Sequence, residues 1–272
     1  MLFLSDILIY PVKSLGGISV REALVQLRGL QYDRRWMLTD ADGLFVSQRE
    51  VPEMALLGAA IEPPFLRVFV KKDPSQQVLV PLEYDATDKK RVQIWSQHCM
   101  ARMSDHLINE WFSDVLRRRL HLVHMPDSTR RTTDGRYAPK GQYVSFADAF
   151  PFLIIGEATL GDLNSRLAVP VPMDRFRPNL VFSGGTPFAE DEWRQFDIGE
   201  AVFSGVKPCA RCIMITTDQQ TAARNAEPLK TLSGYRRSGN KVLFGQNAVC
   251  LNAAAMPVIR KGDSIQITLK KS

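Results

Sequence analysis

The sequence predicts a β-rich α+β protein built from two domains, and three observations support this fold class. Short extended runs separated by turn residues fill the first hundred residues, as in β-barrels and β-sandwiches. Apolar residues at helical spacing form a few short segments beyond residue 100. A polar loop rich in turn residues, 126–142, separates the two halves. We therefore expect a barrel-like domain over residues 1–122 and a second β-barrel domain with flanking helices over 123–272.

Composition is typical of a folded globular chain. The chain has 272 residues, of which 45% are hydrophobic and 24% charged, which is enough for one large or two small domains. Four cysteines are too few for a disulfide framework, and the N-terminus lacks the features of a signal peptide. No apolar run of about 18 residues occurs. We expect a cytoplasmic protein without a membrane span.

The first domain is expected to be a succession of strands ending at turns such as Gly16-Gly17, Asp42-Gly43 and Pro63-Pro64. After Ser104, which can cap a helix, apolar side chains from Leu107 to Leu116 recur at helical spacing. This helix is expected to cover one barrel opening or to join the two halves. The expected strands are residues 3–10, 18–27, 35–39, 54–60, 65–71, 77–82 and 91–95.

The second domain is expected to combine a substantial sheet with two short helices. Leu160, Leu163 and Leu167 share one face of a helix over 157–167, and a second helix is expected over 227–237. The expected strands lie near residues 179–183, 200–206, 213–217, 247–252 and 264–269.

The segment from Lys207 to Cys212 contains a C-x-x-C pair on a turn between two expected strands. A structural zinc site would need a second ligand pair, and the chain has no other C-x-x-C. A thioredoxin-like pair should open a helix, whereas residues 213–217 are typical of a strand. A functional thiolate, favoured by the neighbouring cations Lys207 and Arg211, and a pair of buried structural thiols both remain open.

Three further segments place cations beside polar or glycine residues. Lys13 and Ser14 precede Gly16-Gly17, Arg34 lies in the segment DRRW, and Arg177 precedes Asn179 after Arg175. Ammonium, hydroxyl and guanidinium groups of this kind bind anionic oxygens. Taken alone, the Lys13-Ser14 segment is better explained as a plain turn, and a surface ion pair is the simpler explanation of the Arg34 segment.

The net charge of +6, from 35 Lys and Arg against 29 Asp and Glu, raises the alternative of a nucleic-acid-binding protein. The basic residues do not gather in one run with interleaved aromatic residues, as such a surface requires. We expect no nucleic-acid partner.

The segments YPVKSLGG, DRRWML, DRFRPNLVFSG, KPCARCIMITTD, EPLKTLSGYR and LFGQN, in this order, resemble the MOSC family of molybdenum-cofactor proteins, especially its YcbX-like and amidoxime-reducing members. The resemblance implies a MOSC N-terminal β-barrel domain followed by a MOSC domain from about residue 125 to 270. It also brings family-level associations with pyridoxal phosphate and with detoxification, to which no residue is assigned.

The resemblance implies a site for the molybdenum cofactor (Mo-molybdopterin), and the plain and the nucleotide form of this cofactor both remain open. Cys212 matches the molybdenum ligand and would be the catalytic residue, in keeping with the preference of soft metals for thiolates, whereas Cys209 need not touch the metal. Lys13, Ser14 and Arg34 match the residues that bind the phosphate end of the cofactor. The positions that match the pterin lining are Asp148, Ala149, Phe150, Arg177, Asn179, Ala210, Arg211 and Asn247.

The implied activity is the two-electron reduction of N-hydroxylated or N-oxygenated small molecules. No cysteine follows Cys250, so the chain is expected to hold no iron–sulfur cluster and to receive electrons from a separate flavin reductase or ferredoxin-like protein. A carrier of the cofactor, or a sulfur-handling module without turnover of its own, is the alternative that the family also allows.

Overall fold

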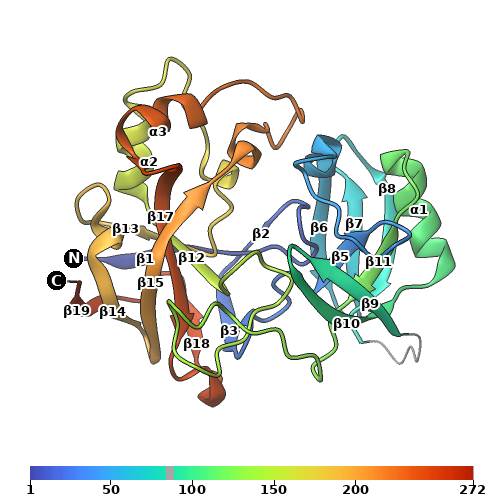
Figure 1. The fold of residues 1–272 in the computed structure, drawn as a ribbon, viewed down its shortest axis with the longest axis horizontal. Coiled ribbons are helices and arrows are strands. Elements are labelled where there is room, and N and C mark those ends of the chain that lie inside the picture. The colour runs from blue at the N-terminus through green and yellow to red at the C-terminus, as the bar shows by residue number, and fades with distance from the viewer. Residues whose placement is uncertain (84–88, 272) are drawn as a thin grey trace.

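The computed structural model describes residues 1–83 and 89–271, which form two β-rich parts side by side (Figure 1). The predicted β-rich α+β class is confirmed, because strands dominate and the helices are few and short. One part is built around a large sheet, seen at the left of Figure 1, and the other around smaller sheets at the right. Among the described residues, no helix is both long and apolar enough to cross a membrane.

The large sheet forms the framework of the second part. Its strands pair antiparallel except for β12 and β13, which run parallel. All five residues of β12 are buried, so this strand lies in the middle of the core. In spatial order the sheet contains β19 (Ile265–Lys270), β14 (Trp193–Ile198), β15 (Ala201–Arg211), β17 (Lys241–Cys250), β12 (Phe152–Gly156), β13 (Leu180–Ser183), β1 (Phe3–Ile9) and β2 (Ile18–Val20), with β16 (Arg237–Ser238) beside β17.

Three smaller sheets complete the part of the chain that the structure describes. One pairs β5 (Trp36–Thr39), β11 (His121–His124), β10 (Gln97–Met103) and β9 (Lys89–Ile94); the next pairs β6 (Leu57–Glu62), β7 (Phe65–Val70) and β8 (Asp73–Pro81); the last pairs β18 (Val258–Arg260), β3 (Glu22–Gln26) and β4 (Gly29–Leu30). Helix α1 (His106–Leu116) buries Ile108, Phe112 and Leu116 in the core of the first part, as its apolar spacing predicts.

Two helices flank the large sheet near the top of Figure 1. They are α2 (Glu157–Asn164) and α3 (Leu229–Tyr235), and they confirm the predicted helices over 157–167 and 227–237 with shorter ends. Short 3₁₀ helices occupy Pro52–Leu56 (η1), Met173–Arg175 (η2), Ala189–Glu192 (η3), Ile213–Thr216 (η4) and Ala253–Ala255 (η5).

Several sequence-based predictions of local structure are wrong. The residue that caps α1 is Asp105 and not Ser104. The expected strand at 213–217 is the 3₁₀ helix η4, because the chain turns away from the sheet once β15 ends at Arg211. The expected turn at 207–212 is the last part of β15, which follows β17 through two register shifts. The expected strand at 54–60 begins only at Leu57, because Pro52 starts a 3₁₀ turn before it.

The chain passes between the two parts more than once. Strand β1, at the N-terminus, pairs with β13, and β3 pairs with β18 near the C-terminus. The first residues of the chain therefore lie in the sheet of the second part. The domain boundary expected between residues 122 and 123 stays a prediction.

Candidate functional site

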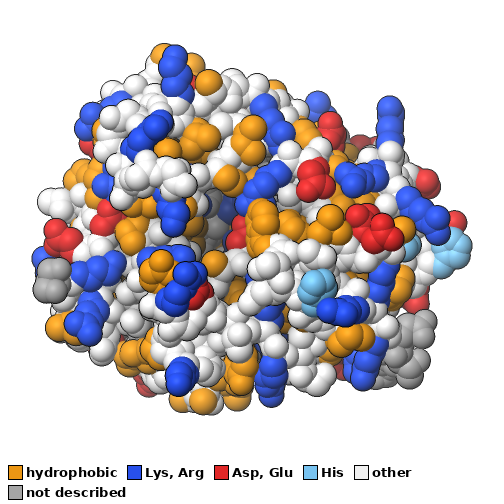
Figure 2. Space-filling model, in the orientation of Figure 1, with side chains coloured by type: hydrophobic (Ala, Val, Ile, Leu, Met, Phe, Trp, Pro, Cys, Tyr) orange, Lys and Arg blue, Asp and Glu red, His pale blue; other side chains and the backbone are white. Residues whose placement is uncertain are grey.

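A pocket of about 270 Å³ opens between the two parts. Figure 2 shows a hollow near the centre of this face, with basic and acidic side chains beside it. The structure brings all the sequence-predicted site residues together in its lining, although their roles in binding stay predictions. These residues are Lys13, Ser14, Arg34, Asp148, Ala149, Phe150, Arg177, Asn179, Ala210, Arg211, Cys212 and Asn247.

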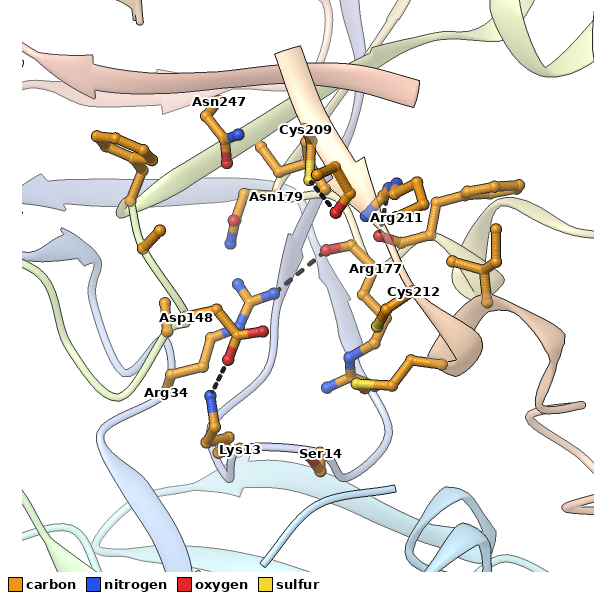
Figure 3. Close-up of a pocket in the computed structure, with 18 of the residues that line it drawn as sticks. Lys13, Ser14, Arg34, Asp148, Arg177, Asn179, Cys209, Arg211, Cys212 and Asn247 are labelled. Atoms are coloured by element: carbon orange, nitrogen blue, oxygen red, sulfur yellow. Dashed lines mark hydrogen bonds and ion pairs between the residues drawn. The ribbon is translucent and has the colours of Figure 1, made fainter. Parts of the chain in front are cut away.

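Lys13 and Asp148 form an ion pair at one wall of the pocket (Figure 3). The Lys13 Nζ donates to Asp148 Oδ1 at 2.5 Å and to the carbonyl oxygen of Phe146 at 2.8 Å. Burial lowers the pKa of Lys13 to about 8, although the Asp148 carboxylate acts in the opposite direction. Burial alone would raise the pKa of Asp148, but Lys13 and Arg49 outweigh it and hold that pKa well below its usual range. The pair therefore stays ionised at neutral pH.

The lowered pKa of Lys13 predicts a pH-dependent stability. Between pH 8 and about 10.5 the unfolded chain holds a proton on Lys13 that the native protein has lost. The contribution of Lys13 to the free energy of unfolding should therefore rise over this window, by about 3 kcal/mol. Urea unfolding of the wild type and of Lys13→Met at pH 8 and at about pH 10.5 measures this contribution. The difference in free energy of unfolding between the two proteins isolates Lys13, because the titrations of all other groups are common to both. A difference that does not change with pH would contradict the lowered pKa.

Two guanidinium groups, those of Arg34 and Arg177, lie against the ring of Tyr10. Their central carbons are 4.3 and 4.2 Å from the ring centroid. Arg34 is neutralised by the buried Asp33, to which its Nη1 donates at 2.7 and 2.8 Å, and its Nη2 donates to the carbonyl oxygen of Arg177 at 3.2 Å (Figure 3). Burial lowers the pKa of Arg177 to about 10, and among the described residues its Nη2 has no hydrogen-bond partner. Arg177 thus keeps a buried donor for a ligand.

The backbone around these cations is strained. Ser14, Arg34 and Arg177 have φ angles of 71°, 49° and 55°, in the left-handed region that side chains other than glycine seldom adopt. Such conformations persist where the surrounding structure imposes them, and they cluster at binding sites. All three residues line the pocket.

Gly17 makes room for the Tyr10 ring that supports both guanidinium groups. A Cβ atom at residue 17 would lie 2.5 Å from Cε1 of Tyr10. We expect Gly17→Ala to displace the ring and to reduce the free energy of unfolding by about 1–3 kcal/mol. Gly135→Ala is the control in urea unfolding, because no atom lies within 4 Å of its added Cβ. Equal stabilities of the two variants would show that the ring moves aside without cost.

Strand β15 brings the cysteine segment to the pocket. Arg211 ends the strand, and its Nη2 donates to the carbonyl oxygen of Phe176 at 2.9 Å, which fixes the position of the following Cys212. Cys209 and Cys212 are free thiols, and Figure 3 shows them at separate places on the pocket wall. The structure thus separates the two sulfur atoms of the C-x-x-C pair.

The surroundings of Cys212 do not form a protein-only metal centre. Within residues 1–83 and 89–271, no three His, Cys, Asp or Glu side chains lie close enough to bind one metal ion. A structural zinc site, which needs four protein ligands, therefore has no support in the described part of the chain. The pocket holds two separate thiols, Cys209 and Cys212, among cations. A thiol there can bind a metal only if the other ligands come from a bound organic molecule.

The sequence analysis missed several lining residues, of which Arg49 is the most informative. It comes from the loop between β5 and η1, and its Nη2 donates to Asp148 Oδ2 at 3.0 Å. Lys207, which the sequence analysis noted only as a neighbour of the thiols, lies 4.1 Å from the ring centroid of Tyr137. The sequence around Arg49 and around Lys207 looks like that of an ordinary solvent-exposed loop or strand, so no local signal could have identified either residue.

A buried amide pair connects the two parts beside the pocket. The Nε2 of Gln48 donates to Gln219 Oε1 at 3.1 Å and to the carbonyl oxygen of Ser14 at 2.7 Å. Gln219 Nε2 donates back to Gln48 Oε1 at 3.0 Å. These bonds fix Ser14 relative to the second part.

Two family descriptions match the chain and define its class. The MOSC N-terminal β-barrel domain matches residues 1–119, and the MOSC domain matches residues 141–266. The chain belongs to the MOSC-domain family that includes the amidoxime-reducing components and the molybdenum cofactor sulfurases. The resemblance found in the sequence is therefore confirmed.

Similarity to individual relatives covers most of the chain. Mitochondrial amidoxime-reducing component 1 is 32% identical over 278 residues in both Mus musculus and Homo sapiens; the match covers 95% of this chain and 80% and 81% of those proteins. The molybdenum cofactor sulfurase of Oryza sativa subsp. japonica is 36% identical over 263 residues, which is 89% of this chain and 32% of that protein. The chain thus spans about a third of the length of the sulfurases that it matches.

Proposed function

We propose that this protein is a molybdenum-cofactor-dependent oxidoreductase that reduces N-hydroxylated or N-oxygenated small molecules. The observation behind the proposal is one pocket that joins the thiol of Cys212 to several cations, of which Lys13 and Arg175 are buried. The similarity to amidoxime-reducing components over 80% of their length supports the same reaction class.

The residues present fit the cofactor by the chemistry of their donors. The buried Nη2 of Arg177 lacks a partner among the described residues, as expected of a group that binds an anionic ligand. Lys13 and Ser14, both buried at the pocket, are suited to hold the phosphate end, and Cys212 is suited to bind the metal. When bound, the cofactor supplies the two-electron redox chemistry, while the protein binds and orients the reactants.

The overall reaction that we propose is balanced. The substrate takes up two electrons and two protons, its N–O bond breaks, and the products are the reduced nitrogen compound and water. The electrons come from a separate protein, for which a flavin reductase or a ferredoxin-like protein is suitable. A cytoplasmic location stays a prediction.

The chain contributes binding and the exclusion of water. Phe150, Leu153, Phe176 and Ile215 provide an apolar part of the pocket lining, next to the polar wall of Lys13 and the arginines. A small organic substrate can bury its apolar part there, because such surfaces are a favourable environment for it.

Turnover of an aromatic amidoxime, with dithionite-reduced viologen as the donor, tests the proposal. The protein is produced in a host that synthesises the cofactor, and protein from a host that lacks this synthesis is the control. We expect one amidine formed per two electrons consumed, in the loaded protein alone. Loaded protein that reduces neither an amidoxime nor an N-oxide would contradict the proposal.

A cofactor carrier or sulfur-handling module is the second candidate. The observation that favours it is the 36% identity with the matching third of the rice sulfurase. Stoichiometric bound cofactor without turnover, together with transfer of the cofactor to an acceptor apoenzyme, would favour this function.

A further inference from the structure

Arg49 is held rigidly in the pocket by contacts on several sides. Its Nη2 donates to Asp148 Oδ2 at 3.0 Å, and its guanidinium carbon lies 4.6 Å from the centroid of the Trp95 ring. Arg224 of the second part donates its Nη1 to the carbonyl oxygen of Arg49 at 3.2 Å. A guanidinium fixed in this way loses little conformational freedom when it binds a further group.

One donor of this guanidinium is unused. The Nη1 of Arg49 is buried, and among the described residues no hydrogen bond satisfies it. A buried donor without a partner is costly unless a ligand binds to it. Arg49 therefore has a vacant donor inside the pocket.

Arg49 and Cys212 line the same pocket. Burial favours the neutral form of Arg49, but the Asp148 carboxylate and the Cys212 sulfur outweigh it and raise the pKa of Arg49 above its usual value. The same guanidinium thus bonds the carboxylate and lines the pocket together with the thiol. Because Lys13 and Arg49 share the single carboxylate of Asp148, the cluster retains a positive charge next to the thiol.

We propose that the Nη1 of Arg49 donates a hydrogen bond to the oxygen of the substrate N–O group and thereby favours substrates with a strongly accepting oxygen, above all N-oxides. This inference rests on the proposed reductase function. The oxygen of an N-oxide bears a formal negative charge, and hydrogen bonds between charged groups are about twice as strong as those between neutral groups. Arg49 binds the oxygen throughout and transfers no proton; the electrons come from the separate donor and the protons from water.

The test compares the loaded wild-type protein with Arg49→Gln and Arg49→Lys. Arg67→Gln is the matched control, because Arg67 also contacts a carboxylate, that of Glu62, and an aromatic ring, that of Phe69, but lies outside the pocket lining. Calorimetry on the oxidised proteins measures the affinity for an aromatic N-oxide and for the parent heterocycle without the oxygen. Bound molybdenum per chain and thermal unfolding are measured on the same samples, and kcat and KM with a chemical reductant complete the set.

We expect Arg49→Gln to weaken binding of the N-oxide about ten- to a hundredfold and to leave binding of the parent heterocycle unchanged. Arg49→Lys, which keeps the charge but not the planar donor pair, should give an intermediate loss. Bound molybdenum should match the wild type in both variants, and Arg67→Gln should match it in every measurement.

Two results would overturn the inference: equal affinity of the wild type and Arg49→Gln for the N-oxide, or loss of bound molybdenum in Arg49→Gln, which would show that Arg49 holds the cofactor instead. Wild-type protein that binds the N-oxide without reducing it would count against the proposed function. The affinities would still decide the role of Arg49 in that case, because binding is measured without turnover. If Arg49→Gln does not fold, Arg49→Lys gives the same comparison.

Discussion

Replacing Cys212 by serine is expected to abolish turnover of N–O substrates, with a fall in kcat of at least about a thousandfold. Cys212 directly follows β15 and contributes its thiol to the pocket that Arg49 also lines. A serine oxygen is a much poorer ligand for a metal that prefers thiolates. X-ray absorption of the loaded variant should show one sulfur neighbour fewer at molybdenum than the wild type, and a turnover assay should show the lost activity.

The variants Cys209→Ser and Cys99→Ser test whether Cys212 is the cysteine that binds the metal. Cys209 lines the same pocket, but its Sγ donates to the carbonyl oxygen of Ala210, at 3.8 Å. Cys99 belongs to β10, outside the pocket lining. We expect both variants to keep the wild-type number of sulfur neighbours. If the number of sulfur neighbours at molybdenum is unchanged in Cys212→Ser but reduced in Cys209→Ser, then Cys209 and not Cys212 is the metal ligand.

The sequence predicts the fold class and many of the strands because alternation and turn residues are local signals. Strands β12 and β14 escaped prediction for different reasons. The five residues of β12 are all buried, and a short continuous apolar run lacks the alternation that distinguishes a strand from a helix. Strand β14 breaks the alternation, because its buried residues Trp193 and Phe196 are three positions apart and its register against β19 shifts between them.

The predicted site residues came from the order of motifs, and their spatial arrangement could not be derived from the sequence. Lys13 and Asp148 are 135 positions apart, and Gln48 and Gln219 are 171 apart. Contacts of this range depend on how the two parts pack, which no local pattern specifies. Arg49 was missed for the same reason, because its significance lies in partners that are distant in the sequence.

The segment that delivers Asp148 to the pocket depends on one buried arginine, Arg131. Its Nη1 donates to the carbonyl oxygens of Ser145 and Ala147 at 2.7 and 2.5 Å, and its Nη2 donates to that of Asp148 at 2.8 Å. The residue is only 4% exposed. These bonds satisfy carbonyl groups of an irregular segment that otherwise lacks a sheet partner for them.

Replacing Arg131 by methionine is therefore expected to reduce the free energy of unfolding by about 3–5 kcal/mol, because it leaves buried carbonyl groups unsatisfied. Turnover should fall as well, since Asp148 would lose its fixed position opposite Lys13 and Arg49. Urea unfolding measures the first effect, with Arg130→Met as the control: Arg130 is exposed and donates to a single carbonyl oxygen, that of Asp127, so its loss should cost less than about 0.5 kcal/mol. Similar stabilities of the two variants would mean that the segment keeps its conformation without Arg131, and that the ion pairs of Asp148 alone position it.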